Sequence, residues 1–315
     1  MNLAAFDFRE SAEFLKKCQV LEEHDIKGTV CPWELNAGEP PREDLHDTLE
    51  ALYIWTREEN KDFCKTNIDL ALDYVTRKFD WYKKETEPIK SYDSTFYLLA
   101  LHNYLTYEED RHLLEIENYA RSYLIRYFED NPPHNLREYS NPYWKAAVLA
   151  LILRRENEST KLLEDWLEQE PTLPHPENEE NHMGRGYMYP HDFFSTFGTK
   201  LMAINLILPN KVLTNLNKLI PKGFVSRDLD EVSFNSSIMF GLCTLNLKLY
   251  KNLDFISETT KKISNEIENR LISGGVKRGK YFPLRESWPT FFFYFSKTLC
   301  EGKELFNTAG RKDQY

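Results

Sequence analysis

Glycine, cysteine and long apolar runs are all scarce in this chain. It has 12 glycines among 315 residues, which argues against a fold rich in tight β-hairpins and favours helices. No apolar run reaches the roughly 18 to 20 residues that a membrane span needs. The N-terminus is acidic and lacks the basic and apolar regions of a secretion signal. We therefore expect a cytoplasmic protein without a membrane span.

Motifs that mark common catalytic or cofactor sites are also missing. The five cysteines are widely spaced, with no C-x-x-C pair, so we expect reduced thiols in the core. The chain has no H-E-x-x-H, phosphate-binding glycine loop or G-x-S-x-G, and we predict neither a metal site nor a cofactor. His46 and Glu50 stand one helical turn apart, but a single pair does not make a metal site. The net charge of −10 argues against a nucleic-acid partner.

What is present is a repeat of two helices. Apolar residues at Ile68, Leu72 and Val75 follow the spacing of an amphipathic helix. Ahead of this helix, and again at later places, a nearly apolar or aromatic run follows a polar start. These runs begin at Leu45, Ser91, Ser140, Tyr189, Leu229 and Arg285. A repeat of about 40 to 50 residues built from two helices is typical of an α/α array.

The repeat predicts a closed ring. The first helix of each pair is apolar on nearly all sides, as an inner helix must be, and the second is amphipathic. The last inner helix has only a short tail after it, so we expect the helix at residues 8–21 to supply its missing partner. We therefore predict an all-α (α/α)6 toroid of six helical hairpins, forming one domain over residues 1–315. A short β-hairpin is expected only at residues 272–284, where Gly274, Gly275 and Gly279 occur.

Two segments carry a family resemblance. Asp47-Thr48 with Ala51-Leu52, followed by Ile68, Ala71 and Tyr74-Val75, is similar to repeats of the terpenoid cyclase and protein prenyltransferase toroids. A less regular copy begins at Asp93-Ser94. Six-hairpin glycosidases and polysaccharide lyases share this architecture. The resemblance therefore implies a toroid but does not identify a reaction.

Asp230 is the acid that the cyclase resemblance singles out. Asp228-Leu229-Asp230-Glu231 looks like the D-x-D-D element of class II terpenoid cyclases, with Glu231 in place of the last Asp. The resemblance implies that Asp230 would protonate an alkene or epoxide, which requires a shielded, hydrogen-bonded carboxyl. The leading hypothesis is therefore a protein that binds a small apolar or amphipathic ligand in its central cavity, with acid catalysis by Asp230.

An alternative hypothesis is a carbohydrate-directed hydrolase or lyase. The inner helices of a closed ring run parallel, so their starts would place Asp47, Asp93 and Asp192 on one rim as paired carboxylates. Each acid has a simpler interpretation as a helix N-cap. The loop at residues 181–194 adds side chains suited to binding sugar, namely Arg185, Tyr189, His191 and Phe194.

Aromatic side chains on inner helices complete the candidate ligand site. Those chosen are Trp55, Tyr143, Trp144 and Trp288, although core packing explains such residues equally well. The ligand class that follows is a small molecule, and the oligomeric state stays open. A third hypothesis is a non-catalytic helical-repeat protein that binds other proteins.

Overall fold

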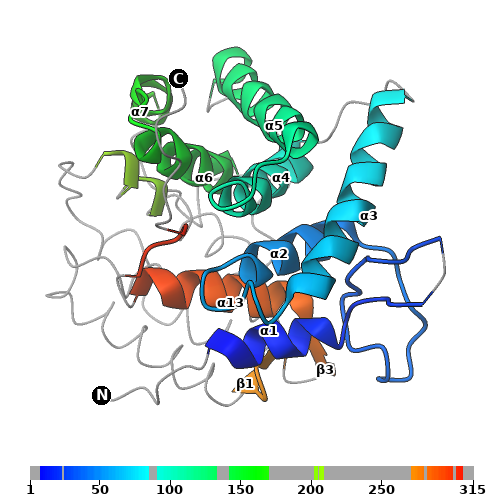
Figure 1. Ribbon diagram of the computed structural model, residues 1–315. Helices are drawn as coiled ribbons and strands as arrows, with labels where there is room; N and C mark the ends of the chain where they lie inside the picture. The colour runs from blue at the N-terminus through cyan, green and yellow to red at the C-terminus, as the bar shows by residue number, and fades with distance from the viewer. Residues whose placement is uncertain are drawn as a thin grey trace, which may run out of the picture.

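The computed structural model describes residues 8–22, 25–84, 91–132, 142–169, 202–204, 206–208, 271–279, 282–300 and 303–307. Its elements are α1 (Phe8–Lys16), α2 (Leu45–Trp55), α3 (Lys65–Lys84), α4 (Ser91–Tyr104), α5 (Arg111–Asp130), α6 (Pro142–Arg155), α7 (Lys161–Glu168), β1 (Leu271–Ile272), β2 (Gly275–Gly279), β3 (Phe282–Glu286) and α13 (Ser287–Cys300) (Figure 1). None of the described helices is long and apolar enough to cross a membrane.

The helices form two layers, as the repeat predicts. The inner helices α2, α4, α6 and α13 are buried on nearly every side, and in α2 every residue from Asp47 to Trp55 is buried. The outer helices α3, α5 and α7 are amphipathic. In α5 the buried residues include Leu113, Ile116 and Ala120, spaced three to four apart on the side that packs against α4. Burial on both sides explains why the inner segments are so apolar.

The two ends of the chain meet and close the ring. α13 packs against α2, and α1 packs against both of them (Figure 1). The Trp55 indole N–H donates to the Ala12 carbonyl at 3.1 Å. The ring of Phe8 meets the ring of Tyr294 edge-on, with centroids 5.0 Å apart. The prediction that the N-terminal helix packs beside residues 287–299 is confirmed.

A small antiparallel sheet, in the order β1-β2-β3, lies at the start of α13. It occupies the stretch for which a hairpin was expected and extends it by a third strand. Gly274 has a positive φ of 80°, and a Cβ there would lie 2.0 Å from the Glu10 carbonyl oxygen. Ser11 Oγ also donates to the Gly274 carbonyl at 3.0 Å. Glycine is therefore required where the sheet contacts α1.

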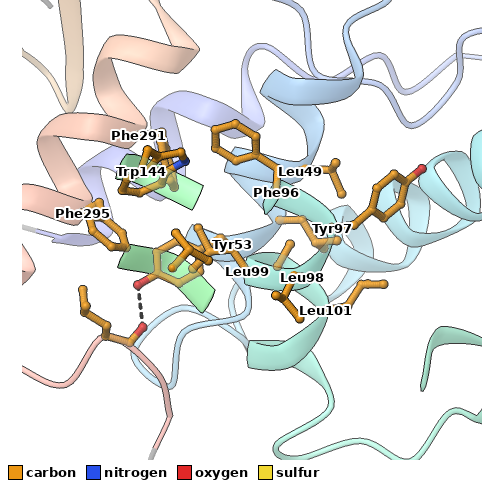
Figure 2. Packing of buried hydrophobic residues seen from close by; sticks show 14 of the residues in the cluster. Leu49, Tyr53, Phe96, Tyr97, Leu98, Leu99, Leu101, Trp144, Phe291 and Phe295 are labelled. Atoms are coloured by element: carbon orange, nitrogen blue, oxygen red, sulfur yellow. Dashed lines mark hydrogen bonds between the residues drawn. The ribbon is translucent and has the colours of Figure 1, made fainter. Parts of the chain in front are cut away.

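Aromatic side chains from the inner helices meet in the middle of the described core. Figure 2 shows Tyr53 of α2, Phe96 of α4, Trp144 of α6, and Phe291 and Phe295 of α13 converging. The ring of Phe291 lies 5.8 Å from Tyr53 and 5.7 Å from Phe96, centroid to centroid. Trp144 lies 5.0 Å from Phe295. Edge-to-face packing of this kind adds to the stabilisation from burial.

Separate segments cross the two ends of the inner helices. At the helix starts, the Ser287 N–H donates to the Pro32 carbonyl at 2.9 Å, and the Val30 N–H donates to Thr48 Oγ1 at 2.9 Å. At the helix ends, residues 303–307 form a strap in which the Asn307 N–H donates to Asn103 Oδ1 at 3.0 Å. The Tyr53 hydroxyl donates to the Leu305 carbonyl of the same strap (Figure 2).

Candidate active site

The residue that caps α2 is Asp44 and not Asp47. The Asp44 backbone is extended, and its carboxylate accepts from the N–H groups of His46 at 3.0 Å and Asp47 at 3.2 Å. Because Asp44 satisfies these free donors, the capping explanation does not apply to Asp47. The Asp47 side chain is therefore available for other interactions.

The Asp47 carboxyl is buried between α2 and the start of α13. Asp47 is 4% exposed. Burial raises the pKa of Asp47 well above its ordinary value, and the charges of Asp44 and Glu286 raise it further, against the lowering effects of Ser287 and Arg42. The carboxyl therefore holds its proton at a higher pH than an exposed aspartate does.

Glu50 lies one turn further along α2 and forms a pair with Asp47. Its side chain is 2% exposed. Its Oε2 has no hydrogen-bond partner among the residues that the structure describes. Burial raises the pKa of Glu50 strongly, and the charges of Asp47 and Asp44 add to the effect. Glu50 was not predicted to be a catalytic acid. The sequence showed only that Glu50 and His46 stand one helical turn apart.

Asp93 reaches the same region from the neighbouring inner helix. It is the third residue of α4, is buried, and pairs with the Nε2 atom of His46 from the start of α2. The His46 ring packs against Phe96, with centroids 5.9 Å apart, and its side chain is 38% exposed. Asp47 and Asp93 thus lie at one end of the molecule near inner-helix starts, which confirms the prediction for these two acids.

Trp288 and Glu286 extend this region along α13. The Trp288 indole N–H donates to Glu286 Oε2 at 3.0 Å, and the Trp288 side chain is half-buried. We call the set His46, Asp47, Glu50, Asp93, Glu286, Ser287 and Trp288 the rim cluster. It holds four carboxyl groups, and two of them have raised pKa values.

Other residues chosen from the sequence lie elsewhere in the fold. Trp55 is at the opposite end of α2, fully buried against α1. Tyr143 packs edge-on against Trp166 of the outer helix α7, with centroids 5.8 Å apart. Trp144 belongs to the central aromatic core. The three residues thus pack against other buried side chains, Tyr143 and Trp144 near the start of α6, and their predicted role in ligand binding stays a prediction.

The remaining predicted site residues lie outside the described residues. They are Asp192 and Asp230 among the acids, and Arg185, Tyr189, His191 and Phe194 among the ligand-binding side chains. Their roles stay predictions.

The rim cluster has the parts needed for acid–base chemistry. A carboxyl with a raised pKa can donate a proton near neutral pH, which an ordinary carboxylate cannot. Burial raises the pKa values of both Asp47 and Glu50. The Asp93 carboxyl is held in one orientation by His46 and contributes a carboxyl from the next helix.

Comparison with known proteins identifies the architecture. No known protein family and no curated protein matches the sequence. Among solved structures, the GH76A α-1,6-mannanase from Salegentibacter sp. HEL1_6 is similar, with a TM-score of 0.51 and 12% identity over 95% of this chain and all of that one. An inactive variant of that mannanase in complex with α-1,6-mannotriose, with two consecutive aspartates changed to asparagine, gives a TM-score of 0.52 over the same shares and at the same identity.

The comparison settles the fold but not the reaction. It confirms the predicted α/α toroid and shows that the similar structures are of the six-hairpin glycosidase type. The terpenoid cyclase resemblance receives no support from it. Of the hypotheses drawn from the sequence, the carbohydrate-directed alternative is therefore better supported than the leading one.

Proposed function

We propose that this protein is a glycoside-cleaving enzyme whose acid–base residues are in the rim cluster. The observation that carries the proposal is the pair of buried acids Asp47 and Glu50, which stand one turn apart on α2 with raised pKa values, together with Asp93 of the adjacent inner helix. The similarity in fold to a mannanase supports a carbohydrate as the substrate class.

Glycoside hydrolysis needs two carboxyl groups with different protonation. One must be protonated to donate to the leaving oxygen, and the other must be ionised to activate water or to attack the sugar. Asp47 or Glu50 fits the first role because burial keeps each protonated to a higher pH. Asp93 is the candidate for the second role because its carboxyl comes from the adjacent inner helix and is oriented by its contact with His46 Nε2.

Trp288 supports a sugar ligand over a wholly apolar one. Its ring is only partly covered and is fixed by the bond to Glu286. An aromatic face beside carboxyl groups is suited to stacking on a pyranose while its hydroxyls are hydrogen-bonded. We infer that Trp288 contributes to substrate binding.

The acids used here differ from those of the similar mannanase. That enzyme is inactive when two consecutive aspartates are changed, whereas this chain has no two consecutive aspartates. The substrate of the mannanase is therefore one member of a panel to be tested and not an assignment.

The test is hydrolysis of oligosaccharides by the full chain. We expect release of shorter sugars from at least one member of a panel that includes α-1,6-mannotriose. Asp47→Asn, Glu50→Gln and Asp93→Asn should each lower the rate, by about 100-fold or more for the proton donor. Asp110→Asn is the matched control, since Asp110 is an exposed N-cap of α5 and Asn caps equally well.

Two results would overturn the proposal. One is hydrolysis that survives all three changes, which would place the chemistry elsewhere. The other is saturable sugar binding without turnover, which would make the protein a sugar-binding toroid and not an enzyme.

A further inference from the structure

A second cluster of polar side chains lies at the opposite end of the inner helices. His102 is in the last turn of α4, Glu117 is in α5, and Glu156 follows α6. The His102 Nδ1 atom lies 2.7 Å from Glu117 Oε1 and 3.7 Å from Glu156 Oε1. The side chains of His102 and Glu117 are 2% and 4% exposed. Three potential ligand atoms, all within 4.8 Å of one another, therefore converge in the interior.

The distances match the spacing of ligands around a metal ion. Zinc bonds to imidazole nitrogen and carboxylate oxygen at about 2.0 to 2.2 Å, so two ligands at a tetrahedral angle are about 3.4 Å apart. The two observed separations, 2.7 and 3.7 Å, lie on either side of this value. The third separation is also within 4.8 Å, so an ion could enter after side-chain shifts of about 1 Å.

Arg121 holds one of the carboxylates in the orientation that a metal needs. Its guanidinium pairs with Glu156 Oε2 at 2.5 Å, while Glu156 Oε1 faces His102. Arg121 also pairs with Glu158. Partners of this kind fix the ligand oxygens and are typical of the outer shell of metal sites.

The charges of the cluster favour a cation. With neutral His102, the carboxylates of Glu117, Glu156 and Glu158 outnumber the guanidinium of Arg121. Arg155 is a second cation close to the cluster, and it stacks on Phe306 with its Cζ 5.6 Å from the ring centroid. The ring of His102 meets the same Phe306 at 5.0 Å. Three carboxylates against two guanidinium groups still leave one negative charge.

We propose that His102, Glu117 and Glu156 form a site for a divalent transition-metal ion such as Zn²⁺. The ion takes the place of the proton between His102 Nδ1 and Glu117 Oε1, and this proton is released on binding. The metal links α4, α5 and the turn after α6. This site lies beyond the proposed function, since it is at the other end of the helices from the rim cluster. Sequence analysis predicted no metal.

The experiment is titration of the metal-free full chain with Zn²⁺ by calorimetry, together with thermal melting. We expect one saturable ion per chain, a melting temperature that rises with Zn²⁺, and affinity that falls at low pH because the ligands are protonated. His102→Gln should weaken binding by at least about 100-fold, more than the 10- to 100-fold that outer-shell changes typically cost. His112→Ala should change nothing, because His112 is exposed and pairs with Asp80 at 3.5 Å.

Two results would overturn the site. One is the absence of saturable binding by the unaltered chain at about 100 µM Zn²⁺, which would leave the cluster as an internal ion network only. The other is binding that persists in His102→Gln or Glu117→Gln, which would place the ion elsewhere, for example on thiols. Glu117→Gln keeps the shape of the side chain, so it replaces His102→Gln in the binding test if His102→Gln does not fold. Neither result depends on whether the protein cleaves sugars.

Discussion

The buried carboxyl groups at the two ends of the inner helices have opposite electrostatic surroundings. At the helix starts, Asp47 and Glu50 are buried beside other acids, and their pKa values are raised. At the helix ends, Glu117 and Glu156 face the imidazole of His102 and the guanidinium of Arg121. A single helix, α4, contributes Asp93 to the first region and His102 to the second.

We interpret the helix ends as a region that stabilises the fold and the helix starts as a region that carries out chemistry. Once a carboxylate and a cation are buried together, removing either one is strongly destabilising, because the other charge is left uncompensated. Acids buried beside other acids destabilise the fold as they ionise, and proteins retain such arrangements mainly at functional sites. The stability of the protein should therefore respond with opposite signs to mutations at the two ends.

The largest expected effect is at the helix ends. Arg121→Leu leaves Glu156 without its guanidinium in a mostly buried position, and breaking such a pair costs about 3 to 5 kcal/mol. Urea unfolding of the full chain measures the change. Arg111→Leu is the matched control, because Arg111 is 94% exposed and its pair with Glu115 contributes at most about 0.5 kcal/mol. Equal effects from the two changes would show that the end cluster is not a stabilising network.

Glu50→Gln is expected to have the opposite sign. The raised pKa of Glu50 means that the folded chain favours the protonated form. Its contribution to stability is complete below the unfolded pKa, near 4.5, and is lost as the pH rises through the folded pKa. Gln cannot ionise, so the variant should gain about 1 kcal/mol over the unaltered chain at high pH and almost nothing at low pH.

Thermal melting across the pH range checks this prediction. The advantage of Glu50→Gln should grow above pH 4.5 and then level off. Glu115→Gln, an exposed glutamate on α5, is the control and should show no such trend. A variant that is less stable than the unaltered chain at every pH would mean that the Glu50 carboxyl is well compensated, and the contrast between the two ends would disappear.

The layered fold was predictable because it depends on patterns that are local in sequence. Apolar runs on all sides predicted α2, α4 and α6, and the amphipathic spacing predicted α3 and α5. Closure of the ring was predictable because the last inner helix has no outer helix after it. Only the N-terminal helix remained to supply that outer partner. The glycines at 274 and 275 marked the hairpin, and the structure shows that each lies against α1.

The candidate sites were predictable only in part, because they depend on side chains far apart in sequence. The sequence placed Asp47 and Asp93 near the starts of inner helices, where the structure has them, but it did not single out Glu50, which stands between Leu49 and Ala51. The sequence suggested Asp47 as the N-cap, whereas α2 begins directly after Asp44. An error of three residues at a helix start changes which acid caps the helix and which can make other interactions. His102, Glu117 and Glu156 follow no spacing motif and come together only when α4, α5 and the end of α6 pack.

The smallest expected effect concerns Asp44, which caps α2 and also raises the pKa values of Asp47 and Glu50. Asp44→Asn keeps the cap and removes the charge, so stability at low pH should change by less than about 0.5 kcal/mol. The pKa values of Asp47 and Glu50 should then fall, because one neighbouring negative charge is gone. In this background the advantage of Glu50→Gln should level off at a lower pH. Asp44→Ala loses the cap as well and should cost about 1 kcal/mol at every pH. If Asp44→Asn leaves the pH dependence of the Glu50→Gln advantage where it was, the charge of Asp44 does not act on Glu50, and burial and the neighbouring Asp47 account for the raised pKa of Glu50.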